Sequence, residues 1–249
     1  MIYGMYESAA GMMVNEYRQG VLTNNIANAD TTGFKRDIAV FSERLTAQDA
    51  GQRSGTGADA LRDLSGGVWL GRSEIDFSEG ALQHTANPLD VALAGPGFLM
   101  VEDEHGRQLT RDGRMLRQPD GRLVAAADGA AILGVGGARL SVSPTGGEIS
   151  IDERGRLFQD GRFAGQLAVM DVDDYLALRK VGASRFAVDG AQPRPVATDV
   201  ISGAVERSGA EPVREMVSML EAARVYQLNA QMLTLQDQSL GRLIGATSV

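Results

Sequence analysis

Apolar side chains recur at helical spacing along the N-terminal segment of the chain. Five apolar or aromatic residues there are separated by three or four positions: Tyr3, Tyr6, Ala10, Met13 and Tyr17. This spacing places side chains along one face of an α-helix. The turn-forming run from Asn28 to Gly33 interrupts the pattern. We therefore expect a helix over residues 2–29.

The C-terminal segment carries a longer pattern of the same kind. Pro212 suits a first helical turn, and no further proline follows it. The heptad positions are apolar apart from Asp237: Met216, Met219, Ala223, Tyr226, Ala230, Leu233, Leu240 and Ile244. The expected helix over residues 212–244 would be roughly 50 Å long, which exceeds the width of a small domain.

Between these helices, short apolar runs alternate with glycine-rich turns. We expect strands at residues 89–93, 98–101, 123–125, 131–133, 166–170 and 186–188. Asp-Gly pairs occur between many of them and end at Gly113, Gly121, Gly129, Gly161 and Gly190. Glycine at these places supplies the positive φ that tight hairpin turns require. The middle of the chain is therefore predicted to be all-β and rich in hairpins.

Together the patterns predict an α+β protein with a central β domain. Its long N- and C-terminal helices are expected to pair as a coiled-coil-like layer. Residues 42–67 are polar and rich in Gly, Ser and Ala, which indicates a flexible connector. The expected divisions are the first helix with the turn that follows it (1–36), a flexible linker (37–68), the β domain (69–210) and the second helix (211–249).

The apolar faces of these helices are too long for a small β domain to cover. Burying one large apolar side chain contributes about 1.5–3 kcal/mol, so several left in water would favour binding to another helix. The first helix of the same chain could cover the second, and this alternative stays open. Further apolar residues lie off the heptad positions and would remain for neighbouring chains: Val217, Leu228, Met232 and Leu235.

Charge and composition exclude several classes of function. A net charge of -8 and a pI near 4.9 argue against nucleic acid binding, which needs clustered Lys and Arg. The absence of cysteine excludes disulfides, thiolate nucleophiles and sulfur metal sites. No apolar run reaches the length of about 18 residues that indicates a membrane span. The segment before Arg18 does not have the pattern of a cleavable signal peptide, so we expect none.

No residue pattern predicts catalysis, a cofactor or a metal. An acidic β protein could be a glycoside hydrolase that uses two carboxylates, but with 32 acidic residues no particular pair is informative. His84 and His105 lack metal-ligand spacing, and we expect both at the surface. The glycine-rich run at 134–137 leads into a strand-like stretch, whereas a dinucleotide loop opens a helix. We expect a turn there.

A secreted adhesin or carbohydrate-binding module is the alternative from a different functional class. In such a protein the β domain would bind the ligand, and the helices would form an oligomerisation stalk. A ligand-binding surface of this kind needs exposed aromatic side chains, and Trp69 and Tyr175 are the candidates.

Four segments resemble the flagellar rod and hook axial proteins. They are NNIANADTTGFKR at 24–36, here called the signature, FSEGALQHTANPLDVALAGPGFL at 77–99, LTRDGRMLRQPDGRLV at 109–124 and EPVREMVSMLEAARVYQLNAQML at 211–233. Within this family, the short linker, the single β domain and segment 137–158 look most like the proximal rod protein. Two departures from the family's usual pattern are Ser-Gly-Ala-Glu-Pro at 208–212 and Ala29-Asp30, where Val-Asn is common.

The resemblance implies a structural subunit of the bacterial flagellar basal-body rod and not an enzyme. Such a subunit polymerises through its terminal helices to build the torque-transmitting shaft. Its partners would be copies of itself, other rod and hook subunits and the flagellar type III export apparatus. It would be located in the periplasmic span of the rod. A distal rod or hook-type subunit is the alternative within the family. We also expect terminal helices that order fully on assembly and an independently stable β domain.

The expected assembly interface combines the two helices with the sequence signature after the first one. It comprises Tyr6, Met13, Asn24, Asn25, Ile26, Asn28, Gly33, Phe34, Met216, Met219, Leu220, Ala223, Tyr226, Ala230, Leu233, Leu240 and Ile244. The three asparagine amides either cap the helix end or bond across subunit boundaries. Gly33 offers a positive φ. Phe34 either packs into its own domain or inserts into a neighbouring subunit.

Overall fold

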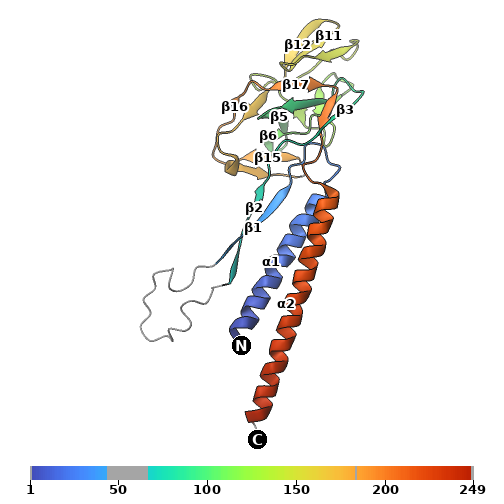
Figure 1. Cartoon of the computed structure of the whole chain (residues 1–249). Helices are drawn as coiled ribbons and strands as arrows, with labels where there is room; N and C mark the ends of the chain where they lie inside the picture. The colour runs from blue at the N-terminus through green and yellow to red at the C-terminus, as the bar shows by residue number, and fades with distance from the viewer. Residues whose placement is uncertain (1, 44–66, 183, 248–249) are drawn as a thin grey trace. The chain divides into compact units, whose positions relative to one another are not determined.

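The computed structural model describes residues 2–43, 67–182 and 184–247 and has an α+β fold (Figure 1). The chain divides into two compact units. The first, here called the helical unit, comprises residues up to 27, residues 37–75 and residues from 211 onward. The second, the β unit, comprises residues 28–36 and 76–210.

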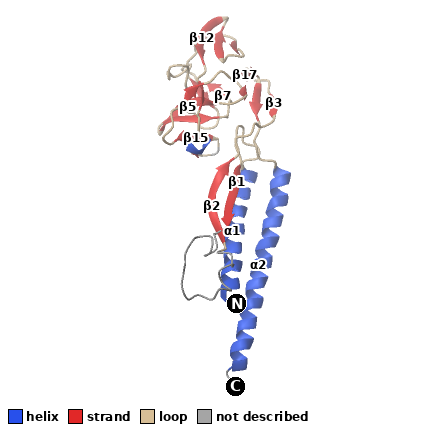
Figure 2. Ribbon diagram, turned by 60° about the vertical axis from the view of Figure 1, so that its left-hand side comes forward, coloured by secondary structure: helices blue, strands red, loops and turns tan. Residues whose placement is uncertain are grey.

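The helical unit contains two helices and a two-stranded ribbon. The elements are α1 (Ile2–Ala27), α2 (Pro212–Thr247), β1 (Asp37–Glu43) and β2 (Val68–Ile75). The two helices lie side by side, as Figures 1 and 2 both show. β1 and β2 pair antiparallel, with a bulge between Ala39 and Phe41. Within the described residues, neither helix has an apolar stretch long enough to cross a membrane.

The β unit is built from antiparallel strands. Its largest sheet has the strand order β14 (Leu178–Lys180), β15 (Arg185–Val188), β6 (Gly106–Thr110), β5 (Phe98–Asp103), β9 (Ala131–Ile132), β8 (Leu123–Ala125) and β7 (Met115–Arg117). β13 (Val169–Asp171) also pairs with β5 and with β16 (Arg194–Pro195). The smaller sheets are β10 (Ile149–Ile151), β11 (Arg156–Gln159) and β12 (Arg162–Gln166); β17 (Asp199–Ser202) with β4 (Val91–Ala94); and β18 (Ala204–Glu206) with β3 (Leu82–His84).

The core of the β unit forms from the apolar residues of these short strands. Its fully buried side chains include Val101, Met115, Leu123, Ile132, Leu133, Leu157 and Phe186. Strands β8 and β9 are buried along their whole length and β5 over its first four residues, so both faces of these strands are covered. The six predicted strands all overlap observed strands. The predicted helices are also confirmed, with α1 ending two residues earlier and α2 extending three residues further than expected.

Asp-Gly turns act as predicted at four of the five positions. Gly121, Gly129, Gly161 and Gly190 have positive φ. The turn between β11 and β12 has positive φ at both Asp160 and Gly161, which is the backbone of a type I′ hairpin. The prediction is wrong for Gly113, whose φ is not positive. A Cβ there would overlap the Val91 carbonyl, so close backbone approach requires this glycine.

The predicted linker over 37–68 is wrong at both ends. Residues 37–43 form β1, and the ribbon packs beside α1 because Phe41 contacts Tyr17. Residues 69–75, expected in the β domain, belong to β2. Residues 28–36, expected with the first helix, belong to the β unit. The centre of the expected linker, residues 44–66, lies outside the described residues.

Candidate assembly interface

Large apolar side chains are exposed along one face of α2. Val217, Leu220, Leu228 and Leu235 expose 52%, 62%, 60% and 59% of their surface. Their separations of three, eight and seven residues place them on one side of the helix. We call these four residues the outer stripe. Met216 and Met232 are exposed next to it. An exposed apolar surface of this extent is typical of a protein contact site.

The predicted interface residues of α2 fall into two groups. Met219, Ala223, Ala230, Leu233 and Leu240 are half-buried. Met216, Leu220, Tyr226 and Ile244 are exposed. Packing within the chain therefore covers part of the predicted heptad face and leaves the rest accessible.

The predicted apolar face of α1 does not point toward α2. Tyr6 and Met13 expose 72% and 70% of their surface. Tyr17 contacts Phe41 of β1 edge to face, with ring centroids 6.5 Å apart. The side of α1 that meets α2 instead carries Gly4 and Gly11. Of this predicted face, Tyr17 thus packs on the ribbon, and Tyr6 and Met13 stay exposed.

Asn25 joins three elements of the helical unit. It is fully buried near the end of α1. Its Nδ2 donates to the Asp37 carbonyl at 2.9 Å, and its Oδ1 accepts from the Asp37 N–H at 2.9 Å. Nδ2 also lies 3.3 Å from Oε2 of Glu215, which is buried in the first turns of α2. The amide expected either to cap the helix or to bond across subunits therefore bonds within the chain.

The remaining signature residues near the end of α1 differ in exposure. Asn24 is exposed, and Ile26 is half-buried. Asn28 belongs to the β unit, where its carbonyl accepts from the Thr31 N–H at 3.1 Å and its Oδ1 accepts from the Thr31 hydroxyl at 3.3 Å. These bonds form the turn that the sequence predicts after the helix.

Gly33 and Phe34 are packed inside the β unit. Gly33 has φ 65°, as expected, and a Cβ there would collide with the backbone of Arg111. Phe34 exposes 1% of its surface, and Lys180 Nζ lies 4.1 Å from its ring centroid. The Phe34 carbonyl accepts from the Gly209 N–H at 2.8 Å. This burial favours packing into its own domain over insertion into a neighbour.

A buried ion cluster links the signature to the strand before α2. Lys35 Nζ lies 2.6 Å from Glu206 Oε1 and donates to the Ser78 carbonyl at 2.7 Å. Arg111 Nη1 donates to the other carboxylate oxygen of Glu206 at 3.4 Å. Burial lowers the pKa of Lys35 below its ordinary value of 10.5, although the Glu206 carboxylate acts to raise it. The cluster ties residues 28–36 to β18 within the β unit.

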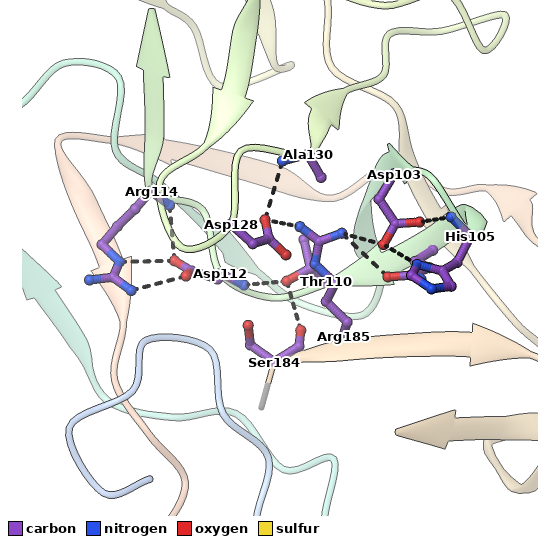
Figure 3. Close-up of polar contacts among 10 residues, drawn as sticks. Asp103, His105, Thr110, Asp112, Arg114, Asp128, Ala130, Ser184 and Arg185 are labelled. Carbon is purple, nitrogen blue, oxygen red and sulfur yellow. Dashed lines mark hydrogen bonds and ion pairs between the residues drawn. The ribbon is translucent and has the colours of Figure 1, made fainter. Parts of the chain in front are cut away.

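Acidic side chains around β15 are paired with arginine (Figure 3). Buried Arg185 pairs with Asp128 and lies 3.6 Å from Asp103. Asp112 accepts two hydrogen bonds from Arg114 at 3.1 Å. These carboxylates are held in ion pairs, which stabilise the fold. In the described part of the chain, no cluster of His, Asp and Glu could hold a metal ion.

The other candidate chemical groups take ordinary structural positions. His84 and His105 are exposed, as predicted. The 134–137 run is a turn, in which the Gly137 N–H donates to the Gly134 carbonyl at 2.9 Å. Trp69 is exposed on β2, in the helical unit, and Tyr175 stacks on Phe77 at 4.9 Å in the β unit.

Sequence reasoning missed Asp37, Glu206 and Glu215. Each is a single acidic residue in a chain with many, and its partner is distant in the sequence. Only Glu215 offered a usable signal, because it is the acidic residue in the first turn of α2. Lys35 lies in the signature, but no pattern in the sequence predicts its pairing with Glu206.

Comparisons with known proteins match both terminal segments of the chain and nearly its whole length. A family model described as the flagellar basal body rod FlgEFG protein C-terminal region matches residues 201–246, and one for the flagella basal body rod protein matches residues 5–35. The chain is 30% identical to the flagellar basal-body rod protein FlgF of Caulobacter vibrioides, over 92% of this chain and 91% of that protein. It is 27% identical to FlgG of Buchnera aphidicola, covering 98% and 99%. With Bacillus subtilis FlgG it shares 28% identity, covering 98% of each chain.

Proposed function

This chain belongs to the flagellar basal-body rod protein family and is a structural subunit of the rod, and we propose that it polymerises through its two terminal helices. Neighbouring subunits cover the outer stripe of α2 and the exposed residues Tyr6 and Met13 of α1. The paired N- and C-terminal helices of successive copies together form the coiled-coil-like layer of the shaft. The β unit folds as a separate part.

The outer stripe carries this proposal. Its four residues each expose more than half of their surface, although they lie on a helix already paired within the chain. Full burial of a leucine-sized side chain contributes about 1.5–3 kcal/mol. Four such residues, together with Met216 and Met232, supply a driving force that offsets part of the entropy lost on association. Repetition of the contact from copy to copy would produce a helical assembly.

Signature residues support the interface from inside the chain. Asn25 fixes the end of α1 to β1 and to the start of α2 through three hydrogen bonds. Gly33, Phe34 and Lys35 hold the segment after α1 inside the β unit. Their role is to order the chain within each unit, and the contacts with neighbours come from the exposed side chains.

The family places the protein in the flagellar basal body, together with other flagellar components. The finer assignment is a position in the periplasmic span of the rod, next to copies of itself and other rod and hook subunits. Delivery is by the flagellar type III export apparatus. The single β domain and segment 137–158 support a proximal rod subunit, with a distal rod or hook-type subunit as the alternative.

Membership in a family of structural rod proteins favours a structural role for this chain over a catalytic one. The carboxylates near Arg185 and Arg114 are held in ion pairs, which agrees with a structural part. The two candidate aromatics of a carbohydrate-binding module have different surroundings. Trp69 belongs to the helical unit and Tyr175 to the β unit, where its ring stacks on Phe77.

Incorporation of a Leu220→Glu variant into basal bodies tests the proposal. The carboxylate would have to be desolvated in the interface without a partner, so incorporation and motility should be lost. Leu220→Met is the matched apolar control and should assemble. Leu116→Glu adds the same charge at an exposed leucine of β7 and should also assemble. Normal incorporation of Leu220→Glu would refute the proposed interface.

A further inference from the structure

Two glycines of α1 lie opposite amide side chains of α2 where the helices meet. A Cβ atom added at Gly11 would lie 2.8 Å from Nδ2 of Asn229. One added at Gly4 would lie 2.8 Å from Nε2 of Gln236. Both distances are shorter than a real Cβ contact allows. Each glycine therefore provides the space that the opposing amide occupies.

These opposed residues repeat every seven positions in both helices. Gly4 and Gly11 are seven residues apart, as are Asn229 and Gln236. The hydrogen bond between Asn25 and Glu215 lies two such repeats further along, fourteen residues from Gly11 in α1 and fourteen from Asn229 in α2. One antiparallel register of the two helices therefore satisfies all three layers together.

We propose that these three layers form a register key, defined as Gly4–Gln236, Gly11–Asn229 and Asn25–Glu215. The key makes α2 pair with α1 of its own chain in this one register. A slip of one helical turn would bring Gln236 against Ser8 and Asn229 against Asn15, both of which are buried and larger than glycine. A slip of seven residues would separate Asn25 from Glu215 and leave both without that bond.

The same key disfavours pairing between two α2 helices. In α2, the seven-residue series that faces α1 consists of Glu215, Ala222, Asn229 and Gln236. It contains no glycine, so two such helices would bring amide against amide. Specificity of this kind arises from penalising the wrong partner as well as from fitting the right one.

The residues of the key lower helix stability while they specify the register. Glycine in a helix interior lowers stability relative to alanine. Gln236 Oε1 is buried and accepts no hydrogen bond within the described residues. Polar residues at helix contacts are known to specify register at a cost in stability. With the register fixed, the outer stripe is presented at a defined position, although the key itself does not require polymerisation.

Disulfide trapping in the purified full-length protein tests the key, because the chain contains no cysteine of its own. The reporter is Gly4→Cys with Gln236→Cys. The off-register reporter is Gly4→Cys with Leu243→Cys, whose second site lies outside the key, seven residues from Gln236 and so displaced by about 10.5 Å along the helix. The in-register pair should cross-link at least about tenfold faster, since cysteines more than about 7 Å apart are not bridged without movement of the backbone.

Changes at the Gly11–Asn229 layer then show whether size matching sets the register. Gly11→Leu should abolish the preference for the in-register reporter. The exchange Gly11→Asn with Asn229→Gly restores the fit and should restore the preference to within about twofold, because volume-conserving swaps are tolerated best. Gly20→Leu is the matched control, since no atom lies within 4 Å of a Cβ added there, and it should have no effect.

Three results would overturn the proposal. They are equal cross-linking of the two reporters in the parent protein, an unchanged preference in Gly11→Leu, and failure of the exchange variant to recover. Because cross-linking is measured within single chains, these results are independent of whether the outer stripe drives assembly. Should Gly11→Leu not fold, the exchange variant still decides the question.

Discussion

Asn25 and Asp37 exchange two hydrogen bonds of 2.9 Å, one to the carbonyl and one from the N–H of Asp37. The side-chain amide thus pairs with the backbone as a neighbouring strand would. It fixes the start of β1 against the end of α1 in the helical unit. An asparagine that sequence alone suggests as a helix cap therefore has a tertiary role.

Replacing this amide should loosen the helical unit. Asn25→Ala leaves buried polar groups of Asp37 and Glu215 without their amide partner and should destabilise the unit by about 1–3 kcal/mol. Hydrogen exchange of the amides in α1 and β1 measures the effect. Asn24→Ala, at an exposed neighbour, is the control and should change protection far less. Equal effects of the two substitutions would contradict a special role for Asn25.

The buried pair of Lys35 and Glu206 should be essential for the β unit. Lys35→Met leaves the Glu206 carboxylate buried with one fewer cation and should cost about 3–5 kcal/mol. Thermal or urea unfolding of the full chain, followed by near-ultraviolet circular dichroism, measures this loss. Arg36→Met removes the adjacent and more exposed pair with Asp76, and a loss of no more than about 1 kcal/mol is expected. A Lys35→Met protein of unchanged stability would show that the cluster does not hold the signature in place.

Two glycine substitutions should have opposite signs. Gly33→Ala places a Cβ against the Arg111 backbone at positive φ and should destabilise by more than about 1 kcal/mol. Gly20→Ala lies in the interior of α1 with open space around it and should stabilise by about 0.5–1 kcal/mol. Unfolding curves of the two variants give the comparison. Stabilisation by Gly33→Ala would refute the close approach to Arg111.

Acid should weaken the β unit partly through Asp76. Burial acts to raise the pKa of Asp76, but hydrogen bonds from Ser78 and the pairing with Arg36 outweigh it, so the pKa lies below 3.8. The unfolded chain therefore takes up this proton at a higher pH than the folded chain. The stability contributed by Asp76 is present above pH 3.8 and is lost as the pH falls through the folded-state pKa.

Asp76→Asn removes this titration and should make stability less dependent on pH below 4. Unfolding free energies of parent and variant, measured over a series of acidic pH values, test the difference. Parallel curves would indicate that Asp76 has the same pKa in the folded and unfolded chains.

Hydrophobic spacing predicted the existence of both helices but not which face of α1 meets α2. The spacing of Tyr6 and Met13 predicts an apolar helix face, and such a face is expected to meet a partner helix. In the structure, Gly4 and Gly11 face α2. Glycine carries no hydrophobic signal, and its role depends on an amide more than 200 positions away in the sequence. Spacing rules within one helix cannot supply that information.

Turn chemistry predicted much of the β unit because it is local. Asp160 and Gly161 form the expected hairpin from adjacent residues alone. The division of the chain between units was harder, since it depends on long-range pairs such as Lys35 with Glu206. The sequence predicts a linker where β1 lies, because the residues that follow it in the chain are polar and rich in glycine. Its pairing with β2 and the contact of Phe41 with Tyr17 define it in the fold.

Maleimide labelling of single cysteines on the outer stripe tests the central claim most directly. Leu220→Cys, Leu235→Cys and, as a control on β7, Leu116→Cys should all react in the purified protein, because each position is exposed. In isolated basal bodies, the two cysteines on α2 should become protected while the cysteine at position 116 stays reactive. Equal labelling of the α2 cysteines before and after assembly would contradict polymerisation through the terminal helices.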